Sequence, residues 1–130
     1  MAESNWVGVV DDDASIRRSL ARVFRGNGIR VATFASAEEY LQRTVAGEPG
    51  CVILDVHLGA MSGFDLQDCL ASEGNPPPII FITAHDDVPP ARLRARGGAS
   101  AHLRKPFCTY LLLALVRRHL QRDPSNGSEP

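Results

Sequence analysis

Five polar side chains follow apolar runs in this chain, and together they could hold a divalent cation and a phosphoryl group. They are Asp11, Asp12, Asp55, Thr83 and Lys105. Three carboxylates in one cleft repel one another, and a divalent cation with oxygen ligands relieves that repulsion. A lysine and a hydroxyl beside the cation would supply a charge and a donor for phosphoryl oxygens. Magnesium is the cation that this set favours, with manganese as an alternative.

Asp55 is the candidate nucleophile of the set. It ends the apolar run Cys51-Val52-Ile53-Leu54 and is followed by the turn residue Gly59. A lone carboxylate at such a position more often caps the next loop. A carboxylate can also accept a phosphoryl group itself and form an acyl phosphate. The four other polar residues favour the acceptor role for Asp55.

Hydrophobic periodicity and turn residues predict five strands that alternate with five helices. The strands are expected over 6–10, 29–34, 51–55, 79–82 and 99–103. The helices are expected over 15–25, from the Ser36 capping box until Gly47, from 63 until Gly74, over 89–96 and over 109–121. This alternation predicts an α/β fold with a doubly wound parallel sheet. All strand carboxyl ends then meet at one edge, which brings the five polar residues together.

Length and composition limit the other functions. A chain of 130 residues with a formal charge of −1 fits one domain, expected over 1–122, with 123–130 as a disordered tail or the start of a linker. The charge balance gives no overall case for binding nucleic acid or a membrane. Three cysteines form no disulfide framework, and no apolar run is long enough to span a bilayer. A cytoplasmic location is therefore expected.

The motifs that carry the polar residues form a recognisable series. They are Val9-Val10-Asp11-Asp12-Asp13, Leu54-Asp55, Met61-Ser62-Gly63, Thr83-Ala84 and Lys105-Pro106-Phe107. In this order and at these separations, over about residues 5 to 121, they resemble the CheY-like receiver domain of two-component response regulators. Residues 81–89 look most like the FixJ-type branch of that family. The resemblance implies a flavodoxin-like (βα)5 fold with strand order 2-1-3-4-5.

The resemblance also implies the roles of the acids. Asp55 would accept a phosphoryl group from a histidine kinase, in a signalling switch that is not an enzyme with turnover. Asp12 and Asp55 would bind magnesium through their carboxylates, and the backbone carbonyl of His57 would be a third ligand. Asp11 would contribute through a water molecule, and Asp13 is expected to lie outside the site.

The same resemblance assigns the groups that meet the phosphoryl oxygens. The Thr83 hydroxyl, the Ala84 backbone N–H and the Lys105 ammonium would bind them. The Lys105–Pro106 peptide bond would be cis. A conformational switch would then act on the face formed by the helix of 89–96, the strand of 99–103 and the helix of 109–121.

Four positions depart from the family pattern. Gly59 stands where receivers usually place proline, so the loop after Asp55 is expected to be more mobile. His102 stands where they place the aromatic switch residue, so it is either a rim side chain on an edge strand or a pH-sensitive switch. His57 and His85 flank the phosphoryl position. They are either solvated loop residues or groups that tune hydrolysis of the acyl phosphate.

Two other functional classes stay open. A degenerate receiver would act only as a protein-interaction scaffold, and Gly59 and His102 keep this alternative. A phosphohydrolase with an aspartate nucleophile usually carries a second acid where this chain has His57. The expected partners are a histidine kinase and a second copy of the chain, through the basic face of 89–121, which could equally be only a solvated face. DNA would be bound only through an output domain missing from this sequence.

Overall fold

The computed structural model describes residues 6–45, 47–84 and 99–120 of the 130-residue chain. Its strands are β1 (Trp6–Val10), β2 (Arg30–Phe34), β3 (Cys51–Asp55), β4 (Ile79–Thr83) and β5 (Ala99–Arg104). Its helices are α1 (Ala14–Gly26), α2 (Ala37–Leu41), α3 (Gly63–Ser72) and α5 (Thr109–Leu120). The helix expected over 89–96, His85 and the tail expected over 123–130 lie outside the described residues.

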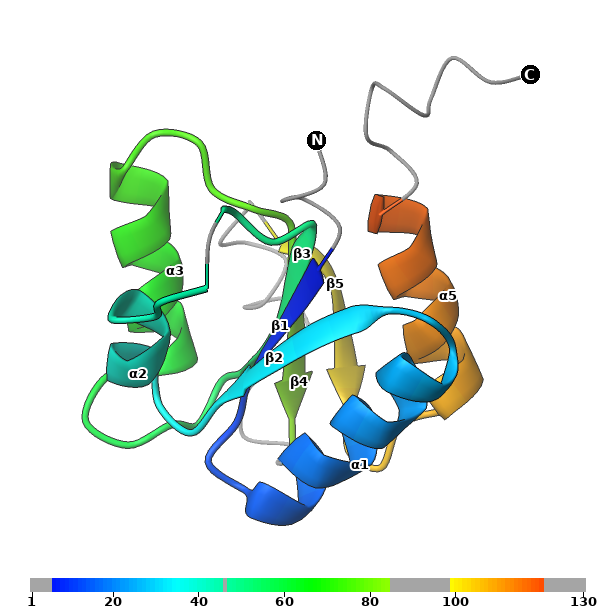
Figure 1. Ribbon diagram of the computed structural model, residues 1–130. Coiled ribbons are helices and arrows are strands. Elements are labelled where there is room, and N and C mark those ends of the chain that lie inside the picture. Colours follow the sequence, from blue (N-terminus) through cyan, green and yellow to red (C-terminus); the bar gives the residue numbers. More distant parts are fainter. Residues whose placement is uncertain (1–5, 46, 85–98, 121–130) are drawn as a thin grey trace.

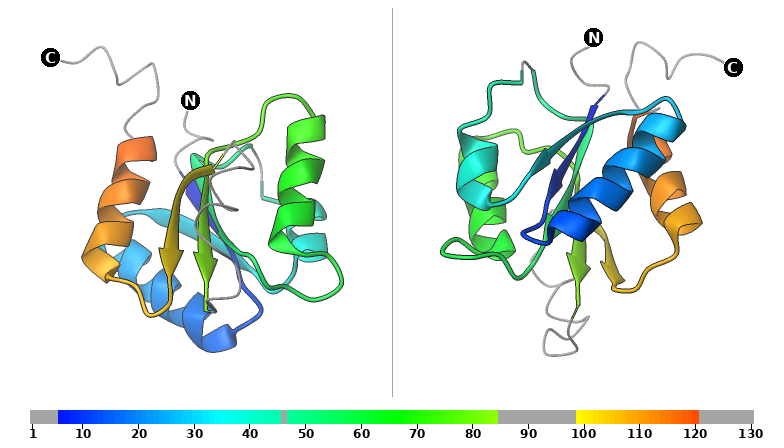
Figure 2. Two further views of the ribbon diagram at one scale, coloured as in Figure 1. Left: turned by 180° about the vertical axis from the view of Figure 1, so that it is seen from behind. Right: turned by 60° about the horizontal axis from the view of Figure 1, so that its bottom comes forward.

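The five strands form one parallel sheet in the order β2-β1-β3-β4-β5. This is the flavodoxin-like order that the family resemblance implies. Helices α2 and α3 cover one face of the sheet, and α1 and α5 cover the other (Figure 1 and Figure 2). Because the inner strands are covered on both faces, β1, β3 and β4 are buried at every residue, as continuous apolar strands in a parallel sheet should be.

Each face of the sheet has its own apolar core. Beneath α2 and α3, Phe64 and Phe81 meet edge to face with ring centres 5.2 Å apart. Beneath α1 and α5, Leu20, Phe24 and Leu112 pack with residues of the three inner strands. Alternate strand residues enter opposite cores, because successive side chains of a strand point to opposite faces.

Trp6 begins β1 and is 1% exposed, deep beneath the α2 and α3 face. A Cβ on the glycine at position 8 would lie 3.5 Å from an atom of the Trp6 ring and 3.5 Å from an atom of the Tyr40 ring. Trp6 thus occupies the amino end of the sheet, at the opposite end of β1 from Asp11.

Short polar side chains set the helix starts. Asp13 caps α1 by accepting a hydrogen bond from Ser15 N at 2.8 Å, so it serves the helix, outside the acid cluster as expected. Ser62 and Asp65 form a full capping box at the start of α3. At α2 the box predicted from Ser36 and Glu39 is only half formed. Ser36 accepts from Glu39 N, but the Glu39 carboxylate reaches one residue further back and accepts from the backbone N of residue 35.

The predicted extent of the second helix is wrong, because α2 ends at Leu41 and does not continue to Gly47. Arg43 provides the physical reason. Its backbone N and its guanidinium both donate to Tyr40 O, at 3.2 Å each, and so take the carbonyl that a further turn would need. The guanidinium also lies 4.4 Å from the centre of the Tyr40 ring. The next residues, Thr44 and Val45, are β-branched and favour helix weakly.

The other described strands and helices begin and end within one or two residues of their predicted bounds. In α5 the apolar run is half-buried as expected, with Leu112, Leu113 and Val116 inside and Tyr110 and Leu111 outside. Cys51 is buried and Cys69 is only partly buried. Within the described residues, none of the helices has the length and apolar character needed to cross a bilayer.

Candidate functional site

Backbone hydrogen bonds continue past the carboxyl ends of the strands and link β3 and β5 to β4, and β1 to β2. Val56 N donates to Ile82 O at 3.0 Å, and Lys105 N donates to Thr83 O at 2.7 Å. Asp11 N donates to Phe34 O at 3.1 Å. These bonds hold the residues that follow each strand in register, so their side chains start from fixed backbone positions.

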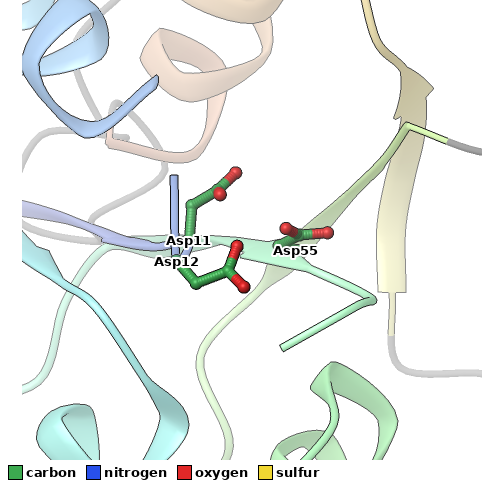
Figure 3. Close-up of side chains that lie close together, drawn as sticks. All are labelled: Asp11, Asp12 and Asp55. Atoms are coloured by element: carbon green, nitrogen blue, oxygen red, sulfur yellow. The ribbon is translucent and has the colours of Figure 1, made fainter. Parts of the chain in front are cut away.

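Three carboxylates meet at this edge (Figure 3). Asp11 and Asp12 follow β1, and Asp55 ends β3; one oxygen from each lies within 4.8 Å of the others. Asp11 is fully buried, Asp55 is 4% exposed and Asp12 is exposed. The structure therefore brings together the acids that the sequence predicts, with two below the surface and one at the mouth.

Lys105 enters the cluster from the end of β5. Its Nζ lies 2.9 Å from Asp11 Oδ2 and 3.5 Å from Asp55 Oδ2. Its side chain is 16% exposed, so one ammonium group neutralises part of a buried acid pair. The shorter contact is to Asp11, the acid to which the family resemblance assigns only an indirect role.

The pKa of Asp55 is raised to about 6, first by burial and then by the nearby Asp11 carboxylate. The His57 backbone N–H and the Lys105 ammonium act in the opposite direction, and they compensate only in part. For Lys105, burial alone would lower the pKa, but the hydrogen bond and charge of Asp11 and the charge of Asp55 hold it above its usual value. Repulsion between the Asp11 and Asp55 carboxylates is therefore only partly relieved, and Lys105 stays positively charged.

Backbone groups fix the direction of the two buried acids. Asp11 Oδ1 accepts from Asp13 N at 2.9 Å, and Asp55 Oδ1 accepts from His57 N at 3.0 Å. The Arg17 guanidinium donates to the Asp11 carbonyl at 2.9 Å. Each carboxylate therefore has one oxygen held by its own loop, and its Oδ2 faces Lys105.

Gly63, the first residue of α3, packs directly on the backbone of Asp55. Its N–H donates to Val56 O at 3.0 Å. A Cβ at this position would collide with the Asp55 carbonyl oxygen and would lie 3.0 Å from Val56 Cα. At Gly59 in the same loop, a Cβ would meet nothing within 4 Å. Glycine is thus required where α3 begins and not where the loop departs from the family pattern.

The acid cluster fits a hard divalent cation. Magnesium takes oxygen ligands and tolerates retained waters. Three carboxylate oxygens within 4.8 Å, with one acid open to solvent, are such a donor set. The raised pKa of Asp55 is a second sign, because the repulsion that raises it is what a cation would relieve.

The other predicted residues are placed as follows. Thr83 is buried at the end of β4, 2% exposed, and Ala84 after it is exposed. The Lys105–Pro106 peptide bond is cis, the isomer that the resemblance implies. His57 is exposed beside Asp55, and its side-chain role stays a prediction, as does the extra mobility expected at Gly59. His102 is half-buried on the edge strand β5, opposite Phe81, and the choice between a rim side chain and a switch role stays a prediction.

Two functional features escaped sequence reasoning. Gly63 lies close to the Asp55 backbone, but the sequence shows only a glycine at the start of a helix. A glycine there is ordinarily interpreted as a turn residue. The preference of Lys105 for Asp11 depends on side-chain reach across the sheet edge, which no spacing in the chain reveals.

The description "Response regulator receiver domain" names the family model that matches residues 7–117. Nodulation protein W of Bradyrhizobium diazoefficiens is 45% identical over 117 residues, covering 90% of this chain and 52% of that protein. Transcriptional regulatory protein FixJ of Azorhizobium caulinodans is 36% identical over 129 residues, covering 99% of this chain and 61% of that protein. The chain thus spans little more than half the length of these relatives.

Solved structures agree with the sequence comparisons. A receiver protein from Burkholderia phymatum has a TM-score of 0.77 and 42% identity, covering 90% of this chain and 95% of its own. Full-length FixJ from B. japonicum has a TM-score of 0.81 and 32% identity, covering 95% of this chain and 62% of its own.

Proposed function

The chain belongs to the family of response regulator receiver domains, and from that membership we propose that Asp55 accepts a phosphoryl group from a histidine kinase. The observation that carries the proposal is the convergence of Asp55 with two further acids and Lys105 at one sheet edge. In this reaction an Asp55 carboxylate oxygen attacks phosphorus, the bond from phosphorus to the donor nitrogen breaks, and the leaving imidazole keeps that bond's electron pair. The product is an acyl phosphate.

Each surrounding group has a distinct part in the proposal. The His57 N–H holds Asp55 Oδ1 and so limits rotation of the carboxylate. Lys105, already 3.5 Å from Asp55 Oδ2, would shift its pairing from Asp11 toward the phosphoryl oxygens. The Thr83 hydroxyl and the Ala84 N–H, at the end of the adjacent strand, would donate to the same oxygens.

Magnesium is the proposed cofactor, with manganese as an alternative. Asp12 and Asp55 would hold it through their carboxylates, His57 through its backbone carbonyl, and Asp11 through water. When bound, it would neutralise charge on the carboxylates and on the phosphoryl group. Asp12 is exposed and can meet an incoming hydrated ion.

Acceptance of the group is expected to switch the domain rather than to give turnover. The acyl phosphate adds about −1.5 to −2 charges at the sheet edge. We propose that the face containing β5 and α5 responds, together with the helix expected over 89–96, and that it forms a homodimer. Tyr110 and Leu111 support this proposal, since they are 85% and 48% exposed on α5. His57, His85 and His102 are proposed to tune the lifetime or the switch.

The names of some relatives bear on the output of the proposed switch. Several are transcriptional regulators by name, and this chain covers little more than half of them. We therefore propose that a DNA-binding output part belongs to the complete protein, and that DNA is bound only there. The cytoplasmic location expected from the sequence also stays a proposal.

Incubation with acetyl phosphate and magnesium, followed by intact mass measurement, tests the phosphoryl acceptor. One added phosphoryl group is expected, and it should be lost in Asp55→Asn and when the metal is removed by a chelator. Asp13→Asn is the matched control, because Asp13 only caps α1 and should leave incorporation intact. No addition would favour the scaffold alternative, and sustained release of phosphate over many turnovers would favour the phosphohydrolase.

A further inference from the structure

Five arginines gather along α1 and the edge strand β2, away from the acid cluster. Arg18, Arg22 and Arg25 lie at i, i+4 and i+7, so they share one face of α1. Helix α1 packs against β2, the outermost strand on its side of the sheet (Figure 1). Arg30 is the first residue of β2. At the opposite end of this group of arginines, the Arg17 guanidinium donates a hydrogen bond to the Asp11 carbonyl.

The surface between these arginines is hollowed. One hollow of about 570 Å³ is lined by Ala14, Arg17, Arg18, Ala21, Arg22, Arg25 and Thr33. A second of about 390 Å³ is lined by Arg25, Gly28, Ile29, Arg30 and Val31. Arg25 borders both, so the two hollows adjoin at its side chain, and together they are called here the arginine groove. Small residues of α1 leave room on its floor, and Thr33 adds a hydroxyl.

Among the residues that the structure describes, no carboxylate forms an ion pair with the exposed arginines of the groove. Within the described part of the chain, Arg18, Arg22, Arg25 and Arg30 are exposed and form no ion pair. No acid stands within α1, although like charges at i and i+4 on a helix weaken it. The chain thus keeps a repulsive row of forked cations around an open groove, which suits an anionic ligand with planar acceptor groups.

Dimensions and neighbouring charge indicate which anion fits. From Ala14 to Gly26, α1 extends about 18 Å at 1.5 Å per residue. An extended peptide covers that length with about six residues at roughly 3.3 Å each. Beyond the Ala14 end stand Asp12 and Asp13, both exposed, which would repel a longer polyanion. The groove has no aromatic side chain on which a base could stack, so a nucleic acid strand is the poorer fit.

We propose that the arginine groove binds a short, extended, acidic peptide segment of a partner protein. Alternating acids on one side of such a segment would meet the arginine row. The outer edge of β2 has no strand partner within the described sheet, so its backbone groups are open to an added strand. This binding site lies apart from the acids that receive the phosphoryl group, and the proposal does not rest on phosphoryl transfer.

Fluorescence anisotropy with a labelled peptide of three alternating Glu-Thr pairs, which is the length that fits along α1, tests the proposal. We expect it to bind at least about tenfold more tightly than the same peptide with Gln for Glu, and to weaken as salt rises. Arg22→Gln combined with Arg25→Gln should weaken binding about tenfold. The matched control is Arg104→Gln combined with Arg118→Gln, which removes the same charge from exposed positions outside the groove and should change binding by less than about twofold.

Other outcomes would overturn the proposal. Equal losses in the two double variants would mean that only total charge matters. Tighter binding of a single-stranded DNA octamer than of the acidic peptide would assign the groove to nucleic acid. Equal binding of the Glu and Gln peptides would remove the role of the arginines. Both double variants should keep the circular dichroism spectrum and the urea unfolding midpoint of the parent, which would show that they are folded.

Discussion

Two regions next to helix α1 differ in whether their charged side chains are buried and paired or exposed and unpaired within the described residues. At its amino end, Asp11 and Asp55 are buried and share one ammonium group, Lys105. Along its length, the arginine groove holds exposed cations with no carboxylate partner in the described chain. The acid cluster is positioned by contacts within the fold, so its charges are fixed before any ligand arrives. The exposed guanidinium groups of the groove have no such ion pairs among the described residues, so a bound ligand would determine their positions.

The difference predicts where a lost charge destabilises the fold. Lys105→Met should reduce the free energy of unfolding by about 3 kcal/mol in metal-free buffer, because it leaves buried acids without their cation. Arg22→Met, in the groove, should change it by less than about 0.5 kcal/mol. Urea unfolding of both variants at neutral pH measures the contrast. Similar losses in the two variants would show that the groove is also held by internal pairing.

Backbone packing around the acid cluster gives the next largest effect. Gly63→Ala should cost about 2 kcal/mol, because the added methyl group meets the Asp55 backbone. It should also weaken magnesium binding measured by calorimetry, since Asp55 and His57 share that backbone.

Gly59→Ala is the matched control for Gly63→Ala. Its Cβ meets open space, so both its stability and its magnesium affinity should stay near those of the parent. If Gly63→Ala bound magnesium normally while losing stability, the glycine would serve only the packing of α3.

The smallest expected effect concerns repulsion within the acid cluster. The pKa of Asp55 is raised from 3.8 to about 6, so between these values the folded state binds more protons than the unfolded state. Stability without metal should therefore fall as pH rises through this window. Asp55→Asn mimics the neutral acid and should stabilise the fold by about 1 kcal/mol above pH 6, a value reduced for solvent screening.

Urea unfolding in chelator-containing buffer at about pH 4 and about pH 7.5 checks this effect. The gain from Asp55→Asn should vanish at the lower pH, where the native carboxyl is already protonated. A gain that is equal at both values would contradict a repulsive origin.

Much of this architecture is accessible from the sequence because parallel strands obey strong rules. Continuous apolar runs ending in Asp11, Asp55 and Thr83 can form covered strands only if those residues share an edge. The end of α2 was not accessible, because Arg43 reaches back to a carbonyl of its own helix. The pairing of Lys105 with Asp11 and the contact of Gly63 with Asp55 depend on tertiary distances of a few ångströms, which residue types do not encode.

The place of Trp6 determines which optical signals the protein can give. It is the single tryptophan, buried at the amino end of β1 while the acid cluster lies at the carboxyl end. Its emission should be that of an indole in an apolar medium and should shift to longer wavelengths on unfolding. Events at the acid cluster occur about 16 Å away, at roughly 3.3 Å per strand residue. Tryptophan fluorescence is therefore a reporter of folding in this protein and a poor reporter of magnesium or phosphoryl binding.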